Sequence, residues 1–110
     1  MTSLTFRIAV LACLVTLCPM SPVIAQGKTA GVHIDNFAFT PAEITVSPGT
    51  TITWENRDDI PHTVYASDKK TFHSKPLDTN DKFSFTFGTP GEYEYFCTLH
   101  PHMKGKVIVK

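Results

Sequence analysis

The sequence predicts an all-β fold, a Greek-key β-sandwich or small barrel of about seven to eight strands. Several short segments alternate apolar and polar residues with the two-residue period of a strand. Proline and glycine turns separate these segments, as in "VSPGTT" and "FGTPGEY". Beyond the first 25 residues, no segment carries helical periodicity over the length that a helix needs.

The expected strands follow one another along the chain. The run "GVHID" (31–35) alternates apolar and polar residues, and "AEITVSPGTTITWEN" (42–56) contains one strand on each side of a proline–glycine turn. The polar stretch 66–80 is expected to form a loop. The remaining strands are expected in residues 62–66, 81–97 (two strands around a glycine turn) and 105–110.

Residues 1–25 have the layout of a secretory signal peptide. Arg7 precedes an apolar run that ends near Cys18, and small residues lead to an expected cleavage site after Ala25. A membrane anchor is disfavoured, because the run is interrupted at Pro19, short of the ~20 residues that a spanning helix needs. A lipoprotein is a weaker alternative, because Cys13 lies very early in the chain. The sequence therefore predicts export to the periplasm and one domain, residues 26–110.

The charge balance of this domain argues against one class of function, and its cysteine content favours another. The 110-residue chain has ten Lys plus Arg and ten Asp plus Glu, so no basic excess suggests nucleic-acid binding. Removal of residues 1–25 leaves 85 residues, in which Cys97 is the only cysteine. So small a domain often needs a disulfide or a metal, and one cysteine cannot form an internal disulfide. A metal ion would both protect the thiol and stabilise the fold.

The run "FCTLHPHM" (96–103) gathers soft-metal ligands near the C-terminus. Cys97, His100 and Met103 are spaced C-x2-H-x2-M, and residues three apart in a tight loop can face the same side. His102 is out of that phase and is expected to face away. Cys97 shares a strand face with Tyr95, so its thiol is expected to point into the core.

A fourth ligand is expected from one of the upstream histidines. His62 is the preferred candidate, because it follows Pro61 at the point where a turn meets a strand and its ring can be aimed from a stiff backbone. His33 lies among polar residues of the first strand, and His73 lies in the polar loop. Both of these histidines are expected to be solvated.

The donor types of this set favour copper. Two imidazoles, a thiolate and a weak thioether make up the trigonal type-1 copper site used in electron transfer. Zinc prefers four strong tetrahedral donors, and the C-x-x-C-H motif of c-type haem is absent. Taken singly, Met103 is more often a core residue and the loop histidines are more often solvated. Their coincidence with the one remaining cysteine favours the metal.

Two longer stretches resemble the cupredoxins, the blue copper proteins: "ITWEN…PHTV" and "GEYEYFCTLHPHMKGKVIVK". The resemblance covers nearly all of residues 30–110. The short C-x2-H-x2-M loop is similar to the amicyanin type, whereas plastocyanins and pseudoazurins space the loop's histidine and methionine more widely. The resemblance implies that His62, Cys97, His100 and Met103 are the copper ligands.

The resemblance also implies that Asn56 and Thr98 form a hydrogen bond that ties the two ligand loops together and holds the sulfur still. The plainer interpretation of both residues is ordinary turn chemistry. The chain departs from the amicyanin pattern at Leu99, where proline is usual, and at His102, where an aromatic residue is usual. These departures affect the expected partner surface and not the ligand set.

The resemblance implies a monomeric electron carrier and not an enzyme. His100 would be the point of electron entry, within an apolar rim that includes Leu99 and Pro61. The expected partners are transient: a dehydrogenase or cytochrome as donor and a cytochrome or reductase as acceptor, with no membrane association after signal cleavage. The residues expected in the rim are Leu99, Pro101 and Pro61, and the charged residues expected to steer partners are Arg57, Asp58, Asp59, Lys104 and Lys106.

Two other functions remain open from the sequence. Copper storage or delivery would use His102 beside the site. A small oxidase or nitrite-reducing enzyme is disfavoured, because the further copper ligands it needs would have to come from His33, His73 and His102, and the first two lie in segments far from the third.

Overall fold

The computed structural model describes residues 28–110, so the predicted signal peptide and its cleavage site lie outside the described residues. Within the described part, no helix has the length and hydropathy needed to span a membrane. Residues 28–110 contain eight strands, in the order β1 (Thr29–Asp35), β2 (Ala38–Thr40), β3 (Glu43–Val46), β4 (Thr50–Asn56), β5 (Tyr65–Ala66), β6 (Lys82–Phe87), β7 (Gly91–Phe96) and β8 (Lys104–Val109).

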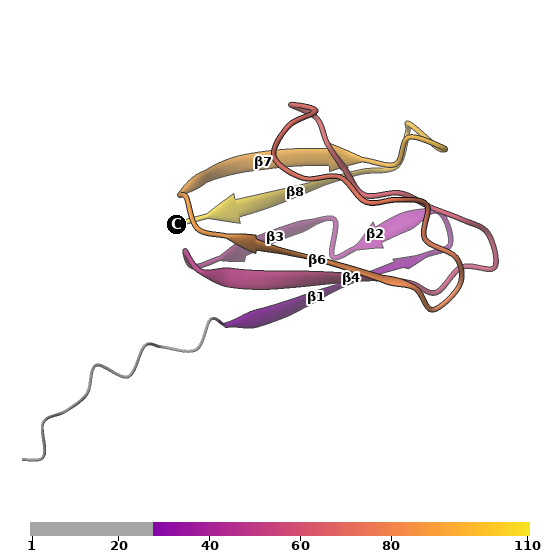
Figure 1. The fold of residues 1–110 in the computed structure, drawn as a ribbon, viewed down its shortest axis with the longest axis horizontal. Helices are drawn as coiled ribbons and strands as arrows, with labels where there is room; N and C mark the ends of the chain where they lie inside the picture. Colours follow the sequence, from indigo (N-terminus) through magenta and orange to yellow (C-terminus); the bar gives the residue numbers. More distant parts are fainter. Residues whose placement is uncertain (1–27) are drawn as a thin grey trace, which may run out of the picture.

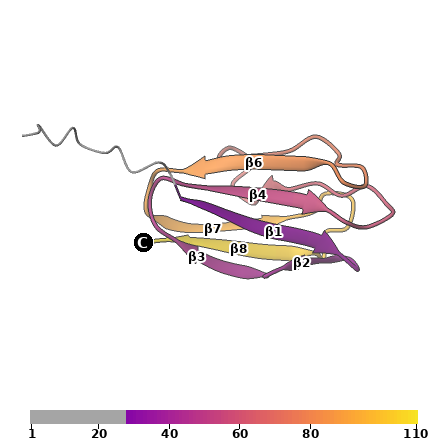
Figure 2. The same ribbon diagram turned by 90° about the horizontal axis from the view of Figure 1, so that it is seen from below.

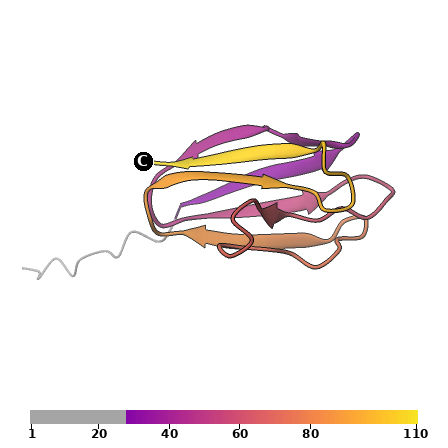
Figure 3. The same cartoon turned by 90° about the horizontal axis from the view of Figure 1, so that it is seen from above.

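The strands form two four-stranded sheets that pack face to face. One sheet has the order β2-β1-β4-β6 and faces the viewer in Figure 2; the other has the order β3-β8-β7-β5 and faces the viewer in Figure 3. The pairs β1–β4 and β3–β8 are parallel, and the other pairs are antiparallel. The predicted all-β sandwich is confirmed, with eight strands.

Alternating apolar residues of both sheets fill the space between them. In β4, Ile52 and Trp54 are fully buried, as their two-residue spacing predicts. The Trp54 ring contacts Phe87 of β6 and Tyr95 of β7, so it bridges the two sheets. Cys97 belongs to the same buried cluster, which confirms that its side chain points inward.

The predicted loop between β5 and β6 packs more tightly than its polar composition suggests. Phe72 and Leu77 are buried in the core, and Phe72 contacts Trp54 with a ring-centroid distance of 5.7 Å. His62 forms an isolated β-bridge with Leu77, so this loop also supports the segment that carries His62. The loop therefore closes one side of the sandwich.

Three connections meet at the end of the sandwich opposite the C-terminus (Figure 1). They are the β1–β2 turn, the segment between β4 and β5, and the β7–β8 loop. Phe37 of the first, His62 of the second and His100 of the third have ring centroids 5.0–5.7 Å apart. The sandwich thus brings the candidate ligand segments together from distant parts of the sequence.

Candidate metal centre

The β7–β8 loop is closed by its own backbone. The amide of His100 donates to the carbonyl of Cys97 at 3.2 Å, and the amide of Met103 donates to the carbonyl of His100 at 2.9 Å. The amide of Cys97 in turn donates to the carbonyl of Met103 at 3.1 Å. Two successive tight turns therefore give the C-x2-H-x2-M spacing its compact form.

This loop and the β4–β5 segment bring three of the four predicted ligands together. One ligand atom each from His62, Cys97 and His100 lies within 4.8 Å of the others. The Nδ1 atoms of both histidines lie 3.8 Å from Cys97 Sγ. His62 and Cys97 are fully buried, whereas His100 is partly exposed. Met103 is 2% exposed and belongs to the same buried cluster as Cys97.

These separations fit a single metal ion. Metal bonds of about 2.3 Å to sulfur and about 2.0 Å to nitrogen, set at 120°, place the two donor atoms about 3.7 Å apart. The observed 3.8 Å therefore needs little adjustment. A thiolate and two imidazoles, with a buried thioether nearby, match the ligand preferences of copper better than those of zinc.

His62 is held at two places, the outer nitrogen of its ring and its backbone. Nε2 lies 2.7 Å from an Asp58 carboxylate oxygen, which leaves Nδ1 facing Cys97. The His62 amide donates to the Leu77 carbonyl at 3.1 Å, and the Leu77 amide donates to the His62 carbonyl at 2.7 Å. A carboxylate on the far nitrogen is a common way to orient a metal-binding imidazole.

Thr63, and not Asn56, ties the two ligand loops together. The amide of Thr98 donates to Thr63 Oγ1 at 2.7 Å, and the two hydroxyl oxygens lie 2.8 Å apart. The Thr63 amide also donates to Cys97 Sγ at 3.3 Å. The prediction of an Asn56–Thr98 bond is therefore wrong: Thr98 is one partner, but the other is Thr63. The position of Thr63 directly after His62 is the sequence signal that could have identified it.

Asn56 instead stabilises the chain that leads to His62. Its side-chain amide donates to the carbonyls of Ile60 and Leu77, both at 2.8 Å, and its Oδ1 accepts the Asp58 amide at 2.9 Å. Its bonds to Ile60 and Asp58 are local, so the plainer prediction of turn chemistry describes Asn56 better. The residue is also fully buried.

Asp58 is not a surface charge, contrary to the sequence prediction. It is only 8% exposed, and its carboxylate accepts the amides of Asn36 at 2.6 Å and Phe37 at 3.0 Å besides contacting His62. Burial opposes ionisation, but the hydrogen bonds from Phe37, His62 and Asn36 outweigh it and lower the pKa of Asp58 to about 2. Asp59, Arg57 and Lys104 are exposed, as expected of steering charges.

The surface around His100 is apolar and includes one residue that the sequence analysis missed. Among the described residues, the exposed large hydrophobic side chains are Phe37 (47%) and Leu99 (50%). Phe37 meets His100 edge to face at 5.2 Å. His102 is exposed, as expected, with its ring centroid 6.3 Å from that of His100. Phe37 is far from the ligands in sequence, and only the β1–β2 turn brings it here.

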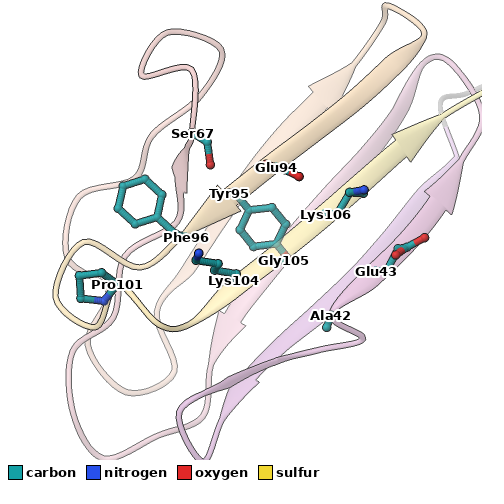
Figure 4. A pocket seen from close by; sticks show the side chains of 10 residues that line it. All are labelled: Ala42, Glu43, Ser67, Glu94, Tyr95, Phe96, Pro101, Lys104, Gly105 and Lys106. Carbon is teal, nitrogen blue, oxygen red and sulfur yellow. The ribbon is translucent and has the colours of Figure 1, made fainter.

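The remaining histidines and a surface hollow lie outside this cluster. His33 and His73 are exposed, as predicted. A hollow of about 640 Å³ opens on the sheet that contains β7 and β8, where Phe96, Lys104 and Lys106 line it (Figure 4). None of His62, Cys97 and His100 lines the hollow. It is therefore separate from the candidate metal centre.

Comparison with known proteins gives one consistent family. A family model described as a cupredoxin-like domain matches residues 7–109. The chain is 34% identical to amicyanin-alpha of Methylorubrum extorquens, over 78% of this chain and 76% of that protein, and 32% identical to amicyanin of Paracoccus versutus, over 87% and 78%. It also resembles the solved structure of a purple cupredoxin from Nitrosopumilus maritimus, with a TM-score of 0.69, 33% identity and coverage of 74% of this chain and 99% of that one. Sequence and fold thus agree that the chain belongs to the cupredoxin-like family.

Proposed function

We propose that this protein is a type-1 copper protein that carries single electrons between redox partners. The observation that carries the proposal is the convergence of His62, Cys97 and His100, whose ligand atoms lie within 4.8 Å of one another. Met103, buried in the same cluster, would add its thioether as a weak fourth ligand. When bound, copper supplies reversible exchange between Cu(I) and Cu(II), which this mixture of soft and intermediate donors suits.

The protein residues would hold the site rigid and give access to it. Rigid ligands favour electron transfer, because the site need not rearrange when the oxidation state changes. The Thr63–Thr98 bond and the His62–Asp58 contact supply that rigidity. His100 is the one partly exposed member of the cluster and lies within the apolar surface of Phe37 and Leu99. A small apolar surface suits the brief docking of redox partners.

The first experiment adds Cu(II) to the protein and records its visible absorption and electron paramagnetic resonance. We expect an intense thiolate-to-copper band and a small copper hyperfine splitting. The Cys97→Ser variant should lose the band, because it lacks the thiolate. A pale spectrum with a large hyperfine splitting would contradict the type-1 assignment. Voltammetry should then give a reversible one-electron wave, and a site that cannot be cycled would contradict electron transfer.

Copper storage or delivery is the second candidate, and the exposed His102 beside His100 is the observation that favours it. The full burial of Cys97 and His62 favours retention of the ion instead. Incubation of the copper form with an excess of chelator separates the two. Slow loss supports electron transfer, and rapid transfer to the chelator supports delivery.

The cellular setting is also part of the proposal. We infer export to the periplasm from the predicted signal peptide at residues 1–25, with a dehydrogenase or cytochrome as donor and a cytochrome or reductase as acceptor. Fractionation of cells that express the full chain tests the location. Recovery of an uncleaved protein in the cytoplasm would contradict it.

A further inference from the structure

The Asp58 carboxylate joins two segments that meet at the candidate metal centre. On one side it accepts the amides of Asn36 and Phe37, and on the other it contacts His62 Nε2 at 2.7 Å. Its backbone carbonyl also accepts the Thr79 hydroxyl at 2.5 Å, so the loop before β6 supports it. Three donors thus converge on one nearly buried carboxylate.

The β1–β2 turn depends on this carboxylate. Asn36 and Phe37 have φ angles of 50° and 58°, and Asp35 pairs with Ala38 across the two-residue turn. Consecutive positive φ angles are typical of a type I′ hairpin, but phenylalanine is uncommon in this region of backbone space. The two amide bonds to Asp58 offset that cost, because hydrogen bonds to a charged acceptor are the stronger kind.

The β1–β2 turn also places the Phe37 ring against both histidines. Its centroid lies 5.7 Å from His62 and 5.2 Å from His100, with interplanar angles of 86° and 85°. Phe37 is 47% exposed, so part of its ring packs against the histidines while the rest is available to a docking partner. The position of this ring and the orientation of His62 therefore share one anchor.

We propose that Asp58 is a positioning residue of the electron-transfer site, which sets both the orientation of His62 and the placement of Phe37 beside His100. The inference rests on the proposed function. Asp58 would act through these two residues and would not itself contact the metal. Its negative charge, next to a ligand, would also favour the more positive oxidised state of the site and so hold the reduction potential down.

The test compares Asp58→Asn with Asp59→Asn. Both variants remove one negative charge, but Asp59 is exposed and makes no side-chain hydrogen bond among the described residues. In the metal-free protein, Asp58→Asn should speed hydrogen exchange at the amides of Asn36 and Phe37 by roughly tenfold or more, because the charged acceptor is lost. In the copper form it should raise the reduction potential and change the copper hyperfine splitting. Asp59→Asn should leave exchange and splitting unchanged and move the potential less.

Each outcome decides the inference. Unchanged exchange at Asn36 and Phe37 in Asp58→Asn, or equal shifts of potential in the two variants, would overturn it. If Asp58→Asn does not fold, exchange in the unaltered protein still tests the anchor. The amides of Asn36 and Phe37 should then be protected relative to that of Thr89, an exposed residue whose amide makes no hydrogen bond within residues 28–110. Equal exchange at all three amides would also overturn the inference.

The exchange measurement is independent of copper. A protein without a type-1 spectrum but with protected Asn36 and Phe37 amides would contradict the proposed function and leave the Asp58 anchor intact. A type-1 spectrum that Asp58→Asn and Asp59→Asn leave equally unaltered would support the proposed function and contradict the role of Asp58.

Discussion

At the scale of single residues, Thr63 decides how the two ligand loops hold together. Its amide faces the Cys97 sulfur, and its hydroxyl accepts the amide of Thr98. The backbone contact would survive any substitution except proline. The hydroxyl contacts, to the Thr98 amide and at 3.7 Å to Cys97 Sγ, would be lost with any residue that lacks a hydroxyl. The two contacts can therefore be separated by experiment.

Replacement of Thr63 by valine should destabilise the metal-free protein by about 1–2 kcal/mol, because valine has nearly the same shape but leaves the Thr98 amide without its acceptor. Thr63 is only 4% exposed, so water cannot easily replace the hydroxyl. Urea unfolding measures the change. The thiolate band of the copper form should persist, since the Thr63 amide still donates to the sulfur.

Thr53→Val is the matched control for this prediction. The Thr53 hydroxyl lies 2.7 Å from that of Ser84 on the outer side of a sheet, where water can take its place. Its loss should change the free energy of unfolding by no more than about 0.5 kcal/mol. Equal effects of the two valine substitutions would show that the Thr63–Thr98 contact does not stabilise the site.

At the scale of elements, β7 and β8 pair through a glycine that makes room for a buried ring. Gly105 lies opposite Tyr95, and a Cβ atom on Gly105 would come within 2.2 Å of the Tyr95 ring. Tyr95 is 1% exposed and contacts Phe39 and Trp54, so its ring has little freedom to move aside. β8 therefore requires glycine here.

Gly105→Ala should destabilise the protein by about 1–3 kcal/mol or more, the usual cost of overpacking a dense core. Thermal unfolding measures it, and the fluorescence of Trp54 should report the displaced ring. Gly88→Ala is the control, because a Cβ atom there meets nothing within 4 Å. A Gly105→Ala protein as stable as Gly88→Ala would mean that Tyr95 is not confined as described.

The elements also show where sequence patterns suffice and where they fail. Alternation located most of the strands, because successive side chains of a strand point to opposite faces and Ile52 and Trp54 therefore both point inward. It missed the short β2, and the run expected at 62–66 forms a strand only at β5. The stretch 66–80 appeared to be a plain loop, since its polar residues outnumber Phe72 and Leu77. Both residues are buried in the core between the two sheets, and local composition cannot reveal that placement.

At the scale of the whole molecule, part of the candidate site could be predicted from the sequence and part could not. Residue type and spacing predicted His62, Cys97, His100 and Met103, because ligand chemistry is readable in a short motif. Phe37 and the role of Asp58 could not be predicted, since both depend on a turn 20 or more residues away from the nearest ligand segment. Long-range placement is a property of the fold and not of any segment.

The fold as a whole should be sensitive to alkali through Tyr95. Its hydroxyl is buried without a hydrogen-bond partner among the described residues, as is the nearby Trp54 Nε1. Burial raises the pKa of Tyr95 to about 12, although the Trp54 N–H, which lies near the phenol without hydrogen-bond geometry, acts in the opposite direction. In the unfolded chain the phenol ionises near its ordinary value of 10.0. Between these two values the unfolded chain binds fewer protons, so the free energy of unfolding falls as pH rises, by up to about 3 kcal/mol.

Tyr95→Phe should remove this component of the alkaline loss and should be at least as stable as the unaltered protein at pH 7, because it deletes an unpaired buried hydroxyl. Urea unfolding of the metal-free protein at several pH values from 7 to about 11, with a reductant to protect Cys97, measures both effects. Tyr93→Phe is the control: its hydroxyl donates to the Thr89 carbonyl at 2.7 Å near the surface, so its removal should not flatten the profile. If the stability of Tyr95→Phe falls with pH in parallel with that of the unaltered protein, the core does not hold the phenol neutral, and the alkaline loss must come from other groups.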